Sequence, residues 1–417
     1  MTTHPPYAAY LGIDWADRKH DICLREADSQ RPEFSVLLHT PEAIHAWAVK
    51  LRNRFHGAPL AVCIESRTTP LIYALLQFDC FVIIPVHPQT LARYRTALHP
   101  SRAKDDPTDA QLLADLVMRH PEQFPRWVPD RPPLRALRQL VEIRRHLVDE
   151  RIRCTNRITA ILKCYYPQPL DWIEETGSVL FCDLVTRWPT LEAIQSASDD
   201  DLKAFFHAHN GRSHTRIEER IHAIRTAIPL TDDPGVVEPS RWWVAATVDQ
   251  LRALLDHIHR IEDEIAQRFS AMPDAELFAK LPGAGANLAP RLLVALGEDR
   301  SRFATTEDLL AFAGIAPVTE RSGTKSRVHW RFACATFIRQ SFVEWAREST
   351  RFSYWAHAYY QRLRDRGKSH QVAIRALAFK WIRILYRCWQ NNTPYDEARY
   401  LLALEKKGSP LIKPAAE

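Results

Sequence analysis

The feature that most constrains the fold is a charged residue inside an apolar segment near the start of the chain. Asp14 interrupts the run Tyr10-Leu-Gly-Ile-Asp-Trp-Ala16, and Glu65 ends a second run, Leu60-Ala-Val-Cys-Ile-Glu65. A carboxylate beside a buried strand costs free energy unless something compensates its charge. Where several carboxylates converge, a divalent cation is the usual compensation. The chain is therefore expected to bring distant acidic side chains together.

Two further carboxylates, Asp106 and Asp109, lie three residues apart at the start of a helical pattern, so both can project from one helix face. A plain helix start is the alternative interpretation, because Asp and Pro107 both suit the first turn of a helix. The upstream strand carboxylates favour a metal site instead. The remaining acidic residues nearby are interpreted as solvated surface charges: Asp17, Asp21 and Asp105.

This set of acids suits phosphodiester chemistry. A phosphodiester repels an incoming nucleophile, and its leaving oxygen departs as an alkoxide. Two Mg²⁺ ions about 4 Å apart neutralise both charges, and carboxylates are the ligands that hold them. The predicted cofactor is therefore Mg²⁺, and its predicted ligands are Asp14, Glu65, Asp106 and Asp109.

The first part of the chain alternates strand and helix patterns. Strands are expected over 10–16, 21–27, 33–39, 60–65 and 80–86, with helices near 41–55, 70–78, 88–97 and 107–119. Three early strands with tight connections, followed by strands separated by helices, predict a mixed sheet flanked by helices. The RuvC-like (ribonuclease-H-like) α/β architecture has this order, and its carboxylates come from the first strand, the fourth strand and a late helix.

Four segments are predicted along the chain. A proline-rich stretch ends an acidic catalytic domain over 1–125, and a helical and coiled-coil region covers 126–275, with an inserted helical segment at 166–240. A mostly α-helical C-terminal domain with helix-hairpin-helix-like turns covers 276–400, and 401–417 is a tail. A heptad pattern with one polar position predicts a coiled-coil arm, formed within one chain or between chains. An amphipathic helix packed on its own domain is the other open interpretation. The heptad residues are Val248, Leu251, Leu255, Ile258, Glu262, Ile265 and Phe269.

Composition narrows the class of protein. The 417 residues carry a net charge of +6, and 44 of the 56 basic residues are arginine. Guanidinium binds phosphate in a bidentate manner and stacks on bases, which favours a nucleic-acid partner, although a GC-rich genome produces the same bias. The sequence has neither a signal peptide nor a 20-residue apolar span, so a cytoplasmic bacterial location without membrane association is expected. The eight cysteines show no C-x-x-C spacing and are expected to be reduced thiols, most of them buried.

Two motifs in the last domain suggest contact with nucleic acid. Leu281-Pro-Gly-Ala-Gly285 resembles a helix-hairpin-helix turn, in which backbone N–H groups at Gly283 and Gly285 bind a phosphate. A turn between packed helices is the simpler interpretation. Ser322-Gly323 follows in an expected polar loop, where the serine is either a nucleophile or incidental to a basic DNA-contacting loop. The basic residues around it are Arg321, Lys325, Arg327 and Arg331.

A basic and aromatic stretch follows over 362–387. It suits contact with a DNA or RNA backbone together with base stacking. An amphipathic helix with a solvated basic face explains the same residues.

Taken together, the chain resembles the insertion-sequence transposases that combine a four-acid (DEDD) RuvC-like domain with a C-terminal serine domain. These are relatives of the Piv-type DNA invertases, described as bridge-RNA-guided recombinases. The resemblance spans nearly the whole chain. It rests on Gly12-Ile-Asp14, Ile64-Glu65, Lys104-Asp-Asp106-Pro-Thr-Asp109-Ala110, Leu281-Pro-Gly-Ala-Gly285, Ala313-Gly-Ile-Ala-Pro317 and Ser322-Gly323. Asp105 stands where the family typically has threonine, and the family's lysine-arginine-glycine stretch after the serine is replaced here by 327–333.

The resemblance implies a DNA recombinase of an insertion sequence in which Ser322 forms a transient covalent link with DNA. The four carboxylates would complete the active site, across subunits of a homo-oligomer, a dimer or tetramer. A structured guide RNA encoded by the element would select the element ends and the target DNA by base pairing.

Two other functions fit parts of the same pattern. A junction-resolving endonuclease would use the carboxylates alone, with water as the nucleophile, and would not need Ser322. A non-catalytic nucleic-acid-binding scaffold would need neither Asp14 nor Glu65.

Overall fold

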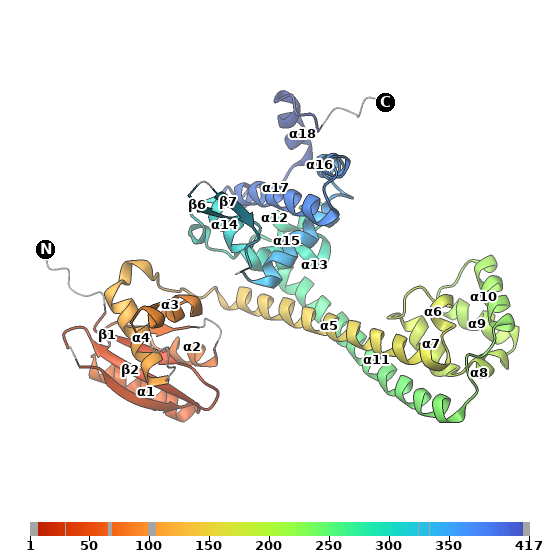
Figure 1. Ribbon diagram of the computed structural model, residues 1–417, viewed down its shortest axis with the longest axis horizontal. Coiled ribbons are helices and arrows are strands. Elements are labelled where there is room, and N and C mark those ends of the chain that lie inside the picture. The colour runs from red at the N-terminus through yellow and green to blue at the C-terminus, as the bar shows by residue number, and fades with distance from the viewer. Residues whose placement is uncertain are drawn as a thin grey trace. The chain divides into compact units, whose positions relative to one another are not determined.

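The computed structural model describes residues 7–29, 31–65, 69–98, 106–323, 325–332 and 334–411. The chain divides into two compact units, Met1–Pro129 and Asp130–Glu417. The first unit is mixed α/β and the second is mostly helical (Figure 1). This confirms the predicted fold class at the level of its secondary structure. Residues 104 and 105 of the motif around Asp106 lie outside the described residues.

The first unit contains one sheet among its described residues. Its strands are β1 (Ala9–Asp14), β2 (Lys19–Glu26), β3 (Glu33–Leu38), β4 (Leu60–Ile64) and β5 (Phe81–Pro85), and its helices are α1 (Pro41–Arg54), α2 (Pro70–Leu75), α3 (Pro88–Leu98) and α4 (Asp106–Arg119), followed by the short 3-10 turn Pro121–Gln123. The strand order is β3-β2-β1-β4-β5. The strands β1, β2 and β3 are antiparallel neighbours, whereas β4 and β5 run parallel to β1.

Alternation along the central strands divides their side chains between two helical layers. Leu11, Ile13, Val62 and Ile64 belong to the apolar cluster that also contains residues of α1 and α2. The intervening positions, which include Cys63, belong to the cluster formed with α3 and α4. Both faces of β1 and β4 are therefore covered, as continuous apolar runs in parallel strands require.

Helix α4 approaches β1 so closely that only glycine fits between them. A Cβ atom on Gly12 would lie 1.8 Å from the backbone oxygen of Ala110 and 2.8 Å from the amide nitrogen of Ala114. Farther along the helix, Asp115 pairs with Arg25, which stands opposite Tyr10 in the β1–β2 register. As α4 advances, it therefore moves toward the start of β1, so the two elements are antiparallel.

The second unit contains a long helical arm, formed by α5 (Pro132–Tyr165) and α11 (Pro234–Ser270), which lie side by side (Figure 1). The start of α5 shares an apolar cluster with the end of α11, and the end of α5 shares another with the first half of α11. The two helices are therefore antiparallel and pair within one chain. The polar heptad position, Glu262, accepts a hydrogen bond from Nε of Arg144 on α5 at 2.8 Å.

The helices that lie between α5 and α11 in the sequence form a core with the end of α5 and the first half of α11. They are α6 (Pro169–Trp172), α7 (Val179–Arg187), α8 (Leu191–Gln195), α9 (Asp199–Ala208) and α10 (His214–Thr226). The C-terminal helices form a separate core with the start of α5 and the end of α11. They are α12 (Ala275–Ala279), α13 (Gly285–Leu296), α14 (Thr306–Phe312), α15 (Thr336–Ser349), α16 (Tyr354–Asp365), α17 (His370–Gln390) and α18 (Glu397–Lys406), with the 3-10 turn Arg300–Arg302.

Two local expectations differ from the structure. Residues 401–406, assigned to the tail, complete α18, because Leu401 and Leu404 pack against the C-terminal core. The segment around Ser322, expected as a polar loop, is a hairpin of β6 (Val318–Ser322) and β7 (Lys325–His329). Gly323 at its turn has φ of +57°, a conformation that favours glycine, so a tight strand connection replaces the loop.

Further findings concern the cysteines and membrane-spanning helices. The eight cysteines are free, and most are buried, as expected for reduced thiols, with Cys164 exposed. Burial raises the pKa of the Cys23 thiol to about 12, which keeps it protonated. No helix among the described residues has the length and apolar character needed to cross a membrane.

The contact at Gly12 gives a direct test of how the acidic helix is held. We expect Gly12→Ala to push α4 away from β1 and to destabilise the first unit by about 3 kcal/mol, at the upper end of overpacking costs. Hydrogen exchange in α4 and β1 should speed up and the melting temperature should fall. Gly177→Ala is the matched control, since its Cβ would approach only the Thr155 methyl group, at 3.3 Å. Unchanged exchange in α4 would contradict the steric argument.

Candidate functional site

Two of the predicted carboxylates end neighbouring strands. Asp14 is the last residue of β1, and Glu65 follows the last residue of β4. The strands are parallel and pair Ile13 with Ile64, so Asp14 and Glu65 stand one step beyond the last matched pair. By alternation, both fall on the face of the sheet that α4 covers. Both side chains are half-buried.

The other two carboxylates lie in the first turn of α4. Because α4 runs antiparallel to β1, this turn lies toward the edge of the sheet where β1 and β4 end. Asp106 is exposed, whereas the Asp109 side chain is only 4% exposed. Acidic residues also stabilise the first turn of a helix, so their position satisfies the helix dipole as well.

A basic partner compensates the buried carboxylate. Nε of Arg95, on α3, donates a hydrogen bond to Oδ1 of Asp109 at 2.6 Å. Removing one partner of a buried ion pair leaves the other charge uncompensated, which is strongly destabilising. Asp109 therefore has a structural role in this arrangement, in addition to any role in catalysis.

Three elements, β1, β4 and α4, bring these residues to one edge, but their side chains do not form a finished metal cage. Among the described residues, no three acidic, histidine or cysteine side chains are grouped so that they could hold a metal ion. The oxygen ligands are of the type that Mg²⁺ prefers. Ion binding at this edge would require the carboxylates to turn toward one another.

Asp21 is a further acidic residue at this edge, although the sequence interpretation dismissed it as a surface charge. It pairs with Asp14 in the β1–β2 register and is half-buried. Register partners in antiparallel strands point to the same face of a sheet. Pairing the residues on either side of the turn between β1 and β2 could have identified Asp21 as the partner of Asp14. Asp17, by contrast, is exposed, as expected.

A buried histidine holds the chain just after Asp14. Nδ1 of His20 accepts a hydrogen bond from the amide of Ala16 at 3.3 Å, and its Nε2 lies 3.0 Å from Nδ1 of His39. An Nδ1 atom that accepts this bond carries no proton, so His20 is neutral. Burial, with a smaller effect of His39, lowers the pKa of His20 to about 4. The ring therefore links the end of β1 to β2.

Ser322 is the predicted nucleophile of the second unit. It is the last residue of β6, is exposed, and pairs with Lys325 across the hairpin. Arg321, Lys325 and Arg327 are also exposed, so their charges are open to an anion. Arg331 differs, because it is half-buried and its carbonyl accepts a hydrogen bond from Arg339 at 3.4 Å.

The glycine turn before α13 is held tightly by the protein itself. Gly283 has φ of +73°, and a Cβ atom there would lie 2.7 Å from the carbonyl carbon of Glu348. Nε1 of Trp345 donates a hydrogen bond to the carbonyl of Pro282 at 3.0 Å. A close approach of helices therefore explains Gly283. Gly285 also has positive φ but faces open space, so phosphate binding by this turn stays a prediction.

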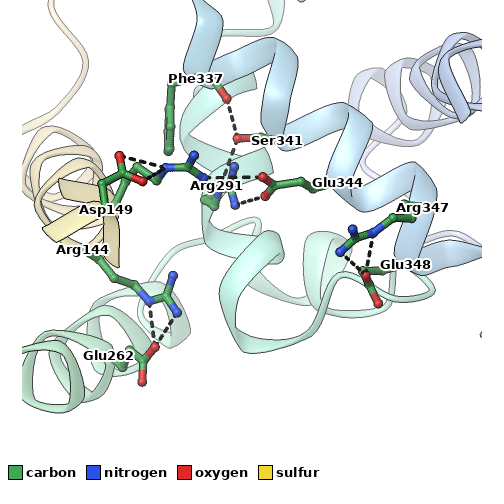
Figure 2. A network of polar contacts seen from close by, with 10 residues as sticks. Arg144, Asp149, Glu262, Arg291, Phe337, Ser341, Glu344, Arg347 and Glu348 are labelled. Carbon is green, nitrogen blue, oxygen red and sulfur yellow. Dashed lines mark hydrogen bonds and ion pairs between the residues drawn. The ribbon is translucent and has the colours of Figure 1, made fainter. Parts of the chain in front are cut away.

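A cluster of arginines lies where the arm meets α13 and α15, as Figure 2 shows. Here the arginines have carboxylate partners: Arg144 binds Glu262, Arg291 binds Glu344 and Ser341, and Arg347 binds Glu348. Arg291 is buried, and burial lowers its pKa. These pairs lie within the arm or within the C-terminal helices. Arg145 of α5 joins the two, because its Nη1 lies 3.5 Å from Oε1 of Glu344 on α15.

Comparison with known families finds two matched regions in the chain. Residues 11–167 match the DEDD transposase model of the IS110 group, and residues 275–361 match a model described as transposase IS116/IS110/IS902 family. The chain belongs to the IS110/IS116/IS902 family of transposases. The first match contains all four predicted carboxylates, and the second contains Ser322.

The transposase is also similar to individual proteins over most of its length. It is 28% identical over 420 residues to the mini-circle putative transposase for IS117 of Streptomyces coelicolor, with 98% of each chain covered. It is 26% identical over 413 residues to the IS900 uncharacterized 42 kDa protein of Mycobacterium paratuberculosis, with 93% and 97% covered. A shorter match, 28% over 163 residues, is to the pilin gene-inverting protein of Moraxella bovis, covering 36% of this chain and 49% of that protein.

The buried histidine predicts how stability depends on pH. Unfolded His20 binds a proton near its ordinary pKa of 6.5, whereas the folded protein resists protonation until about pH 4. The unfolded state therefore holds more protons in this window, so stability falls as pH drops from about 6.5 to 4. We expect His20→Gln to reduce this loss, measured by denaturant unfolding at several pH values. His259→Gln, on the exposed face of α11, is the control. Identical pH profiles for the wild type and His20→Gln would contradict the role of His20.

Proposed function

We propose that this transposase cuts and rejoins DNA strands with two chemical groups, the acidic edge of the first unit and Ser322 of the second. The observation that carries the proposal is the placement of Asp14, Glu65, Asp106 and Asp109 by β1, β4 and α4 at one edge of the sheet. The sheet order β3-β2-β1-β4-β5 supports a RuvC-like domain. When bound, Mg²⁺ would neutralise charge on the reacting phosphodiester.

The covalent step assigned to Ser322 is a phosphoryl transfer. Its Oγ bonds to the phosphorus of a DNA phosphodiester, the bond to a deoxyribose oxygen breaks, and that oxygen takes up a proton as the serine hydroxyl loses its own. A hydroxyl of a second strand then displaces the serine, which regains a proton. The step needs no external energy source, because one phosphodiester replaces another. Exposed Arg321 and Lys325 support it by offering positive charge beside the hydroxyl.

Partners follow from the same proposal. DNA at the element ends and at the target is the substrate, and a structured RNA encoded by the element is proposed to select both by base pairing. Recognition of sequence by RNA leaves the protein to bind backbone and shape, which suits the arginine-rich composition. A homo-oligomer, a dimer or tetramer, would let subunits share one active site. The RNA and the oligomer rest on the family resemblance.

Replacing the serine tests the covalent step. We expect Ser322→Ala to abolish a protein–DNA adduct and to reduce strand exchange more than about 1,000-fold, because the nucleophile is lost. The adduct is measured by denaturing gel electrophoresis with labelled DNA. Ser326→Ala is the matched control, since Ser326 is an exposed serine in the facing strand β7. Retained DNA cleavage by Ser322→Ala would indicate a nuclease with water as its nucleophile.

Replacing Asp106, the exposed acid, tests the metal site without unfolding the protein. Asp106→Asn should weaken Mn²⁺ binding by at least about 10-fold, measured by electron paramagnetic resonance, because loss of even an outer hydrogen-bond partner of a metal ligand costs about 10- to 100-fold. It should abolish strand exchange with DNA binding retained. Asp109 is a poorer choice, because its replacement would leave Arg95 without its carboxylate partner. Asp17→Asn, exposed between β1 and β2, is the control. Full strand exchange by Asp106→Asn would favour a non-catalytic role for this edge.

A further inference from the structure

An open groove lies between the Ser322 hairpin and helix α17. It has a volume of about 1040 Å³ and is lined by the base of β7, the chain just after it, and one face of α17. This volume slightly exceeds the roughly 300–1,000 Å³ typical of small-ligand pockets. The α17 positions that line it follow helical spacing: Val372, Arg375, Ala376, Phe379, Lys380 and Arg383. The opposite face of α17 is buried in the C-terminal core.

Charge distinguishes this groove from the arginine cluster at the arm. Its ionisable lining residues other than one tyrosine are all basic: His329, Lys368, Arg375, Lys380 and Arg383. Among the described residues, no aspartate or glutamate lines it. Within the part of the chain that the structure describes, acidic side chains touch two of these bases, Glu307 at Arg383 (3.3 Å) and Glu320 at His329 (2.9 Å). Both acids are exposed, so these pairs neutralise little charge.

Two half-buried cations in the groove, Arg375 and Lys380, have no carboxylate partner among the described residues. The guanidinium of Arg375 donates a hydrogen bond to the carbonyl of Gly314 at 3.0 Å, but its buried Nη1 has no hydrogen-bond partner in the part of the chain described. Burial, with a smaller effect of Arg339, lowers the pKa of Arg375 to about 10. Burial, together with Arg383, also lowers the pKa of Lys380. An anion in the groove would restore the missing compensation.

Aromatic rings alternate with these cations. The guanidinium of Arg375 lies over the Trp330 ring, and Trp330 remains 45% exposed. Nζ of Lys380 lies 4.8 Å from the ring centroid of Tyr359, and Phe379 lies between the two cations along α17. Exposed aromatic rings beside phosphate-binding cations are how proteins hold unpaired nucleotides, since each base stacks while the backbone follows the charge.

We propose that this groove binds single-stranded DNA, with a base stacked on Trp330 and phosphates at Lys380 and Arg375. The inference rests on the proposed function, because the strand bound here is the one presented to Ser322. Val318 pairs with His329 at the base of the hairpin, four residues along β6 from Ser322. Four residues of extended strand span roughly 13 Å, so a strand of DNA leaving the groove reaches the serine. Rejoining requires an unpaired strand at this point.

Binding of labelled oligothymidylate to the full chain, measured by fluorescence anisotropy at several salt concentrations, tests the groove. Trp330→Ala should weaken binding roughly 5- to 150-fold, the range for loss of one stacked base. Lys380→Gln should lower the slope of log K against log salt by about 0.7, as expected for one lost phosphate contact with a single strand. Trp242→Ala, an exposed tryptophan on α11, and Lys203→Gln, a half-buried lysine on α9, are matched controls and should bind as the wild type does.

Photo-crosslinking gives a second measurement that does not depend on affinity. An oligonucleotide carrying 5-iodouracil should crosslink to Trp330 or Tyr359 in the wild type, as identified by mass spectrometry. Wild-type affinity in both groove variants, or crosslinks only outside the groove, would overturn the proposal. The proposal would also be overturned if oligouridylate or duplex DNA bound more tightly than oligothymidylate and if that binding depended on Trp330 to the same extent. Ser322→Ala should bind oligothymidylate normally, so loss of the adduct with retained binding separates failure of the chemistry from failure of the groove.

Discussion

The contact between α4 and β1 at Gly12 organises the acidic edge of the first unit. A helix that touches a strand backbone to backbone has little freedom to slide, because any Cβ at the crossing would clash with Ala110. The ion pair between Arg25 and Asp115 fixes the direction in which the helix continues. Together these contacts carry the first turn of α4 to the edge at which β1 and β4 end. The positions of Asp106 and Asp109 thus follow from packing elsewhere in the helix.

Several of the cations described above have a carboxylate partner, but two of those in the groove have none among the residues that the structure describes. In the first unit Arg95 neutralises buried Asp109, and at the base of the arm Glu262 and Glu344 neutralise Arg144 and Arg291. The groove beside the Ser322 hairpin has no such partners for Arg375 and Lys380 among the described residues. Even partly buried charge without compensation is costly, so its presence points to a ligand that supplies the opposite charge.

Much of this arrangement could be predicted residue by residue. The apolar runs before Asp14 and Glu65 predicted β1 and β4, and the helical spacing after Asp106 predicted α4, because both periodicities are local. Asp21 was missed, since its relation to Asp14 depends on the register of a hairpin. The segment at Ser322 was taken for a loop, because its polar residues hid a two-stranded hairpin whose side chains are mostly exposed. The sequence predicted Glu262 as one polar position in the heptad, but its partner Arg144 lies on the other arm helix, which no local pattern indicates.

By itself, the sequence determined the kinds of chemical group available, the order of strands and helices, and the membership in a transposase family. These depend on residue type and on spacings of a few residues, which the chain displays directly. Only the tertiary structure decided which charges have partners. Arg95 pairs with Asp109 from a different helix, and Arg375 has no carboxylate partner among the described residues. Both facts depend on how separate elements pack against one another. Such contacts arise only when packing has set the distances between elements, and no local pattern encodes those distances.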